Sequence, residues 1–156
     1  MASKVERGYP AVYGTTNRFP GIPADLDASA SHPNDGASVY FFKGKRYWKY
    51  DMATGRVLQG YPRTYGAGTT YFPGIPAHVD AAMSHWSDGA SIFFFKGSQV
   101  YKYDYVAGAL YPGYPAQFGP GEKHFTGVPS GMAANFNRCG ASGPPQFGAR
   151  CEESNA

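Results

Sequence analysis

The chain has 156 residues, of which 42% are hydrophobic and 17% aromatic, and this composition excludes extended disorder. The net charge is +3 without any run of Lys or Arg, so the basic stripe of a nucleic-acid-binding surface is missing. No stretch approaches the roughly eighteen apolar residues of a membrane span, and residues 1–8 lack the apolar core of a signal peptide. We therefore expect a cytoplasmic or storage-compartment protein, with a secreted protein cleaved from its signal as the alternative.

An internal repeat organises the chain. Residues 19–24, Phe-Pro-Gly-Ile-Pro-Ala, return as residues 72–77, a shift of 53 positions. Four further motifs recur at the same shift: Asp-Ala, Asp-Gly-Ala-Ser, Phe-Phe-Lys-Gly and Lys-Tyr-Asp. Because one register explains all of these matches, we interpret the chain as tandem copies of one structural unit.

Each copy is predicted to contain short strands. In the first copy, residues 24–30 are one candidate, and residues 39–42 form an apolar run with high β propensity. A turn at Gly44 leads to alternating residues 46–50, and residues 57–59 are a fourth, outer candidate. Helix signals are weak, and at most one short helix is expected around residues 62–70. Four strands in about fifty residues are typical of a propeller blade.

A third copy begins and then stops. Residues 125–129, Phe-Thr-Gly-Val-Pro, keep the register of the repeated element, but no Phe-Phe-Lys-Gly strand follows. We divide the chain into blades over residues 1–137, with repeats at about 8–59 and 60–112 and a partial one at 113–137. Residues 138–156 are interpreted as a Gly- and Pro-rich tail. Cys139 and Cys151 lie in it, either as two free thiols or as one disulfide.

The motifs resemble the hemopexin repeat. Its pattern is carried by residues 19–23, 27–28, 40–44 and 47–51 in the first copy, and by their equivalents in the second. The resemblance implies an all-β, four-bladed propeller around a central channel, as in the plant hemopexin-fold albumins. It covers about residues 8–130, which is two complete blades with partial flanking repeats.

The resemblance also implies where a cation would bind. Main-chain carbonyl oxygens of the innermost strands point into the channel in this family, and they correspond here to Asp27, Ser29, Asp80 and Ala82. Such oxygens suit a hard cation, calcium or sodium. The alternative is that Asp27 and Asp80 only fix the start of each inner strand through side-chain hydrogen bonds to the backbone.

Two blades do not close a four-bladed ring. An open arc leaves edges unpaired, and a homodimer that places two arcs in one ring is the simplest closure. The alternative is that the chain is part of a longer protein.

Three loop residues are candidate ligands. His32 and His85 occupy equivalent places, each three residues before an Asp-Gly turn, and imidazole can ligate haem iron or another metal. Trp86 has no aromatic equivalent in the first repeat, where Pro33 stands. The alternative is that the two histidines are loop residues retained by duplication.

No arrangement of residues typical of an enzyme appears. The chain lacks a Gly-x-Ser-x-Gly elbow and a His-Glu-x-x-His motif. We therefore expect a non-catalytic binding module that holds a channel cation and a small ligand such as haem, a polyamine or a metal ion. A protein- or glycan-interaction module is the alternative.

Overall fold

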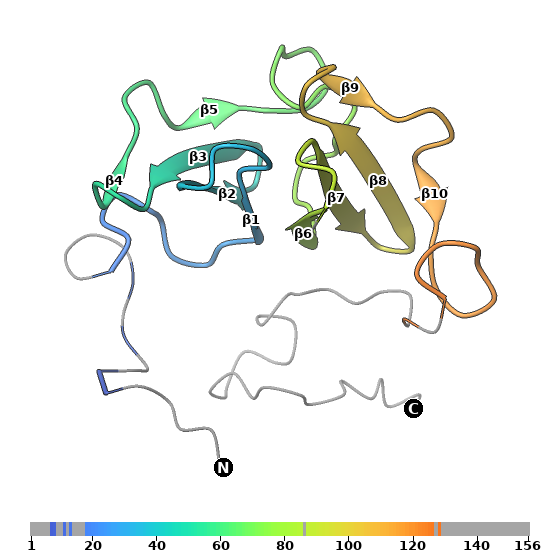
Figure 1. The fold of residues 1–156 in the computed structure, drawn as a ribbon, viewed down its shortest axis with the longest axis horizontal. Helices are drawn as coiled ribbons and strands as arrows, with labels where there is room; N and C mark the ends of the chain where they lie inside the picture. Colours follow the sequence, from blue (N-terminus) through green and yellow to red (C-terminus); the bar gives the residue numbers. More distant parts are fainter. Residues whose placement is uncertain are drawn as a thin grey trace.

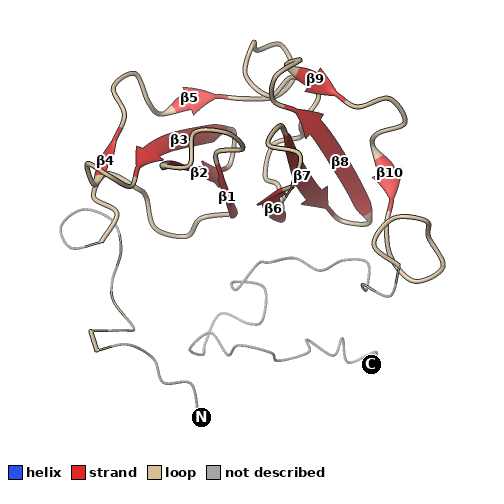
Figure 2. Cartoon of the chain, viewed as in Figure 1, coloured by secondary structure: helices blue, strands red, loops and turns tan. Residues whose placement is uncertain are grey.

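Two antiparallel sheets lie side by side and make up the folded part of the chain (Figures 1 and 2). The computed structural model describes residues 7–8, 11, 13, 18–85, 87–126 and 128. These residues contain ten strands and no helix, and therefore none that could cross a membrane. The predicted all-β fold of two complete blades is thus confirmed. The proposed tail, with Cys139 and Cys151, lies outside the described residues.

The first sheet, called blade 1, comes from the first repeat. Its strands are β1 (Ala28–Ser31), β2 (Ser38–Lys43), β3 (Arg46–Asp51) and β4 (Arg56–Val57), in that order, and β5 (Arg63–Thr64) also pairs with β3. The β2–β3 hairpin is predicted correctly, because an apolar run with high β propensity and an alternating segment flank a glycine turn.

The second sheet, called blade 2, repeats this arrangement. Its strands are β6 (Ala81–Ser84), β7 (Ser91–Lys96), β8 (Gln99–Asp104), β9 (Ala109–Leu110) and β10 (Ala116–Gln117). The last of these pairs with β8 as β5 pairs with β3. The inner strands β1 and β6 contact each other, and the sheets spread outward from them (Figure 1).

Residues 62–70, where at most one short helix was expected, contain no helix. Residues 63–64 form β5 instead, and the N–H of Tyr65 then donates to the carbonyl of Lys45 at 3.0 Å. Because the edge of β3 offers unpaired backbone groups, pairing with it satisfies more of this segment than one helical turn would. The inner strand likewise begins later than predicted, at Ala28, because Asp25 has φ 57° and interrupts the extended backbone.

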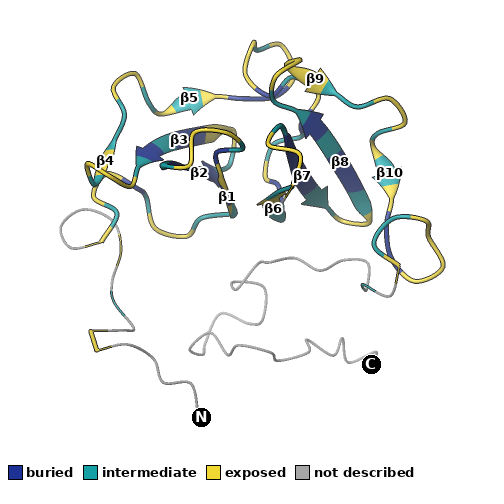
Figure 3. Cartoon of the chain, in the orientation of Figure 1, coloured by how far each residue is buried: buried dark blue, intermediate teal, exposed yellow. Residues whose placement is uncertain are grey.

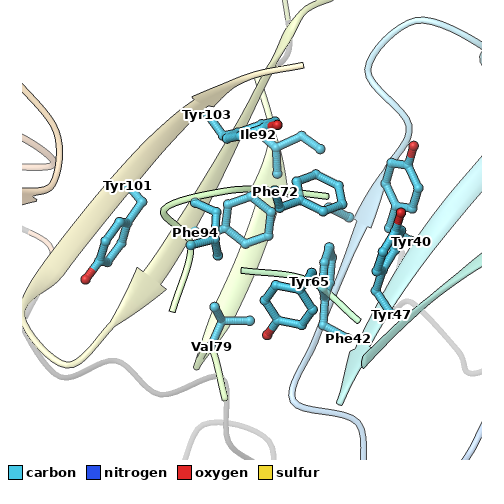
Figure 4. Close-up of a cluster of buried hydrophobic side chains, with 12 residues drawn as sticks. Tyr40, Phe42, Tyr47, Tyr65, Phe72, Val79, Ile92, Phe94, Tyr101 and Tyr103 are labelled. Atoms are coloured by element: carbon cyan, nitrogen blue, oxygen red, sulfur yellow. The ribbon is translucent and has the colours of Figure 1, made fainter. Parts of the chain in front are cut away.

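Each blade has two packed faces because strand residues alternate in direction. On blade 1, Tyr40, Phe42 and Tyr47 face blade 2, whereas Phe41 and Trp48 belong to a separate cluster on the opposite face. On blade 2, the face that packs against blade 1 is the one that corresponds in the repeat to the Phe41 and Trp48 face. It contributes Phe94 and Tyr101 to the cluster between the blades, as Figure 4 shows. Its members are Ala30, Tyr40, Phe42, Tyr47, Tyr65, Phe72, Ile75, Val79, Ile92, Phe94, Tyr101 and Tyr103.

The inter-blade cluster is the largest block of buried side chains, and the buried stretches of β2, β3, β7 and β8 converge on it (Figure 3). Phe72 stands at its centre, with ring centroids 5.5 Å from Tyr40 and 5.6 Å from Phe94. Phe42 and Phe94 are fully buried and pack edge-to-face at 5.2 Å. Such edge-to-face packing favours one relative placement of the two sheets.

The three Phe-Pro-Gly-type elements have one backbone conformation. Phe19, Phe72 and Phe125 have φ values of 50°, 46° and 52°, a left-handed conformation that is rare for bulky residues. In each, the carbonyl of the phenylalanine accepts a hydrogen bond from the N–H three residues later. The described part of the third element therefore has the conformation of the first two, as the register of the repeat predicts.

Candidate functional site

The inner strands present backbone oxygens on an edge that no strand covers. In blade 1 the N–H of His32 donates to the carbonyl of Ser38 at 2.8 Å, which makes these two residues a hydrogen-bonded pair. Hydrogen-bonded and non-bonded pairs alternate along an antiparallel ladder. The register of Ser29 with Phe41 therefore places the N–H and C=O of Ser29 on the edge of β1 that faces away from β2.

Blade 2 repeats this geometry. The N–H of His85 donates to the carbonyl of Ser91 at 2.9 Å, so the register places the backbone groups of Ala82 and Ser84 on the free edge of β6. The Ser84 hydroxyl donates to the carbonyl of Ser31 across the gap between β1 and β6. The carbonyl oxygens of Ser29 and Ala82, both predicted as cation donors, thus lie on the mutually facing edges of the two blades.

The side chains of Asp27 and Asp80 form hydrogen bonds to the backbone within their own blades. An Asp27 carboxylate oxygen accepts the Gly44 N–H at 2.7 Å, and Asp80 accepts the Gly97 N–H at the same distance. Each aspartate thereby ties the start of its inner strand to the hairpin turn of its own blade. This is the structural role considered for both residues, and the donors that the family resemblance implies at these positions are their main-chain oxygens.

A pocket of about 470 Å³ opens beside this edge. Asp27, Ala28 and Ser29 line it from blade 1, and Ala81 and Ala82 line it from blade 2. Phe19, Leu26 and Phe41 supply an apolar wall, and Arg18 and Tyr13 lie at its N-terminal side. The pocket thus combines an apolar surface with the free-edge oxygens. Asp80 does not line it, so the four predicted donors are brought together only in part.

The site fits a hard cation in the chemistry of its donors. Neutral main-chain oxygens lie on the free edges of β1 and β6, and neither strand carries a Lys or Arg, so Arg18 is the one basic residue in the lining of the pocket. Within the described part of the chain, no three His, Cys, Asp or Glu side chains cluster as metal ligands. Any cation would therefore be held by backbone oxygens, with Ser29 and Ala82 the best placed.

His32 is committed to the interface between the blades. It is 7% exposed, its Nε2 lies 2.9 Å from the Tyr105 hydroxyl, and its Nδ1 accepts the N–H groups of Asn34 and Asp35. Burial first, and then the Lys49 charge, lower the pKa of His32 and favour the neutral ring. Haem ligation through His32 would require breaking one of these bonds.

His85 repeats half of this pattern. Its Nδ1 lies 3.3 Å from the N–H groups of Ser87 and Asp88, and its ring packs 5.7 Å from that of Phe93. Neither histidine lines the pocket at the inner strands. Ligand binding by His32 and His85 therefore stays a prediction, and the third candidate, Trp86, lies outside the described residues.

A second hollow, which sequence reasoning missed, lies at the outer side of the inter-blade cluster. Its volume is about 260 Å³, and six tyrosines and Arg63 contribute to its wall. We call it the tyrosine cleft; its polar wall consists of Tyr40, Tyr47, Tyr61, Arg63, Tyr71, Tyr103 and Tyr105. The available signal was that Tyr40, Tyr47, Arg63 and Tyr71 are not repeated 53 residues later, although Tyr61 returns as Tyr114.

The comparison with known proteins agrees with this fold. A model of the hemopexin family matches residues 26–77 and 79–118, more than half of the chain. Pig (Sus scrofa) vitronectin is 37% identical over 87 residues, which are 53% of this chain and 18% of vitronectin. Horse (Equus caballus) interstitial collagenase is 35% identical over 97 residues, which are 62% of this chain and 19% of the collagenase. The chain thus spans less than a fifth of either relative.

Two proteins from Cicer arietinum are among the solved structures to which this chain is similar. A Cicer arietinum albumin showing hemagglutination is 24% identical with a TM-score of 0.46, covering 61% of this chain and 44% of its own. A Cicer arietinum lectin with two metal-binding sites is 26% identical with a TM-score of 0.42, covering 63% and 41%. The family match and the two blades agree in register and extent. The chain belongs to the hemopexin family.

Proposed function

We propose that this chain is a non-catalytic binding module that holds a hard cation, calcium or sodium, at the free edges of β1 and β6. The observation that supports the proposal is the convergence of the Ser29 and Ala82 carbonyls on one pocket. The same pocket takes a small organic cation of the polyamine class, since carbonyl dipoles attract the charge and the apolar wall packs against the methylene chain.

The test separates the two ligands. Calcium and sodium are measured by elemental analysis after dialysis, and spermine by calorimetry, with haem as a comparison ligand. Ser29→Leu inserts an isobutyl group into the pocket but keeps the main-chain oxygen, so spermine affinity falls about tenfold or more while cation content is unchanged. Ser31→Leu, on the same strand but outside the pocket lining, is the matched control. Equal spermine binding by both variants would reject the pocket.

We further propose that two copies pair to complete the ring of oxygens. Among the ring contacts of the described residues, Phe72 pairs with rings of both blades. The ring contacts of Phe19 are with Phe41 and Tyr50 of blade 1, and those of Phe125 are with Phe93 and Phe95 of blade 2. In such a pair, blade 2 of one copy would pack against blade 1 of the other copy, as the two blades pack within one chain. Phe125 of the first copy and the second copy's Phe19 would then both occupy the place that Phe72 fills between the blades, so one of the two rings has to move away. Native mass spectrometry with metal quantified tests this proposal, and a monomer that binds no cation contradicts it.

Recognition of a glycan is the second candidate function, and the tyrosine cleft favours it. Aromatic faces and phenolic hydroxyls together suit ligands that are part apolar and part polar. The cleft contains both, together with one guanidinium group.

A further inference from the structure

The tyrosine cleft lies apart from the inner strands and draws its wall from three parts of the chain. Tyr40, Tyr47 and Arg63 come from β2, β3 and β5 of blade 1, Tyr61 from the turn before β5, and Tyr105 from the turn that follows β8. None of these residues lines the pocket beside β1 and β6. A ligand here would therefore bind independently of the proposed channel cation.

Arg63 is fixed in place without a carboxylate partner. Its guanidinium carbon lies 4.6 Å from the ring centroid of Tyr61 and 4.7 Å from that of Tyr71. Its Nε donates to the Gly60 carbonyl at 3.2 Å, and its Nη1 donates to the Tyr71 hydroxyl at 2.7 Å. Of the ion pairs in the described part of the chain, none involves Arg63.

Such an arginine is well prepared to bind an oxyanion. A guanidinium has five N–H donors in a rigid fork, and the hydrogen bonds above use only two of them. Two aromatic rings and two hydrogen bonds restrict its rotamers before any ligand arrives, so little side-chain entropy is lost on binding. A carboxylate would accept charge-assisted hydrogen bonds from the remaining donors.

The hydroxyls of Tyr40 and Tyr47 stay protonated and can both donate and accept. Burial, and then the hydrogen bond with Tyr105, raise the pKa of Tyr40 far above its usual value. Burial, and then neighbouring Tyr61, do the same to the pKa of Tyr47. Around a carboxylate bound to Arg63, these neutral phenols would add no repulsive charge and would offer partners to ligand hydroxyls.

Blade packing does not require this polar set. At the equivalent positions against the far face of blade 2, Phe93 replaces Tyr40, Val100 replaces Tyr47, and Ala116 replaces Arg63. The packed geometry is nevertheless the same, since Phe93 lies 5.4 Å from Phe125 and Tyr40 lies 5.5 Å from Phe72. Tyr40, Tyr47 and Arg63 thus go beyond what the fold needs at this place, whereas Tyr61 is retained as Tyr114.

We propose that the tyrosine cleft binds a monosaccharide-sized sugar carboxylate of the uronic acid class. Arg63 binds the carboxylate, and the phenolic groups bind the ring hydroxyls and pack against the sugar face. The cleft's 260 Å³ is below the roughly 300–1,000 Å³ typical of drug-sized ligands, which limits the ligand to about one sugar ring.

The test is a calorimetric titration of the full chain with glucuronate, glucose and acetate. Glucuronate binds, whereas glucose and acetate each bind at least about tenfold more weakly, because each offers only half of the contacts. No binding of glucuronate at about 10 mM would overturn the proposal. Acetate binding as tightly as glucuronate would also overturn it, since the sugar would then contribute nothing.

Variants locate the site. Arg63→Gln removes the charge and abolishes glucuronate binding, and Arg63→Lys, which keeps the charge without the fork, weakens it about tenfold. Arg56→Gln removes an exposed arginine of β4 outside the cleft and leaves binding unchanged. Retained binding in the folded Arg63→Gln variant would overturn the proposal.

Two further measurements show whether glucuronate binds in the tyrosine cleft and independently of the pocket beside β1 and β6. On wild-type protein, glucuronate shifts the NMR ring resonances of Tyr71 and Tyr105, and shifts confined to other tyrosines would contradict the site. Spermine binding is unchanged in Arg63→Gln, and glucuronate binding is unchanged in Ser29→Leu. Failure of the channel proposal is thereby distinguishable from failure of this one.

Discussion

The junction between the two blades and the far face of blade 2 are built from equivalent positions but are completed differently. At the junction, Tyr65 and Phe72 of the connecting segment cover Phe42, with ring centroids 5.4 and 5.6 Å away. At the far face, Phe118 and Phe125 cover Phe95 at 5.2 and 5.3 Å. The same packing solution therefore forms with or without a second sheet behind it.

What differs is the layer beyond the connecting segment. At the junction, Phe94 and Tyr103 of blade 2 pack on Phe72 from the other side, and Tyr105 bonds to His32 and Tyr40. Within the described part of the chain, the far face of blade 2 has no such third layer. The difference indicates that the connecting segment folds onto the blade before it, and that the next blade then adds burial and polar contacts.

The largest expected loss of stability comes from removing one phenylalanine ring at the junction and, for comparison, one at the far face of blade 2. Phe94→Ala empties a fully buried site between the blades and is expected to cost about 4 kcal/mol of unfolding free energy. Phe93→Ala, on the opposite face of the same strand, removes a ring that is 7% exposed and is expected to cost about 3 kcal/mol. Urea unfolding measures both, and an equal or reversed order would contradict the layered description.

The sequence predicted this layering only in part. The hairpin strands, the repeat of 53 residues and the third Phe-Thr-Gly-Val-Pro element follow from local patterns, and all three appear in the structure. The edge on which the Ser29 carbonyl lies follows from pairing with β2, which residue types alone do not reveal. For the segment around Arg63 the sequence allowed at most one short helix and did not predict β5, because the pairing partner of β5, the edge of β3, is distant in sequence.

The polar contacts of the third layer give the next largest effect. Tyr105→Phe removes the hydroxyl that bonds to His32 Nε2 at 2.9 Å and to the Tyr40 hydroxyl at 3.0 Å. Because His32 is buried, we expect a loss of about 2 kcal/mol in unfolding free energy, measured by urea unfolding. Tyr50→Phe, the matched control on the face of blade 1 away from the junction, should cost much less. Equal losses would mean that the inter-blade hydrogen bonds add no stability.

The two blades can also be compared through acid unfolding. Partial burial alone would raise the pKa of Asp88, but hydrogen bonds from Ser91 and Ala90 outweigh it and lower the pKa to about 2. Because the folded pKa is below the unfolded value, this contribution is present at neutral pH and is lost as pH falls from about 5 toward 2.

Asp35 occupies the equivalent turn of blade 1. Burial alone would again raise its pKa, but hydrogen bonds from Ser38, Lys49 and Ala37 lower it further than that of Asp88. We therefore expect Asp35→Asn to reduce the dependence of stability on pH between about 5 and 2 more than Asp88→Asn does. Urea unfolding at a series of pH values measures this, and a larger change in Asp88→Asn would show that Lys49, 3.0 Å from Asp35, adds little.

The smallest expected loss of stability comes from replacing Arg63. This substitution tests most directly how the junction differs from the far face of blade 2. Arg63→Ala gives the junction the residue that Ala116 supplies on the far face, so we expect a loss below about 1 kcal/mol, typical of exposed cation–π contacts. Thermal unfolding measures the loss, with Arg56→Ala as the control for removing a surface charge. Since the same packing forms around Ala116, a loss above about 2 kcal/mol would show that Arg63 supports the fold. A small loss of stability together with abolished glucuronate binding would show that Arg63 serves ligand binding in the tyrosine cleft and is not needed for the fold.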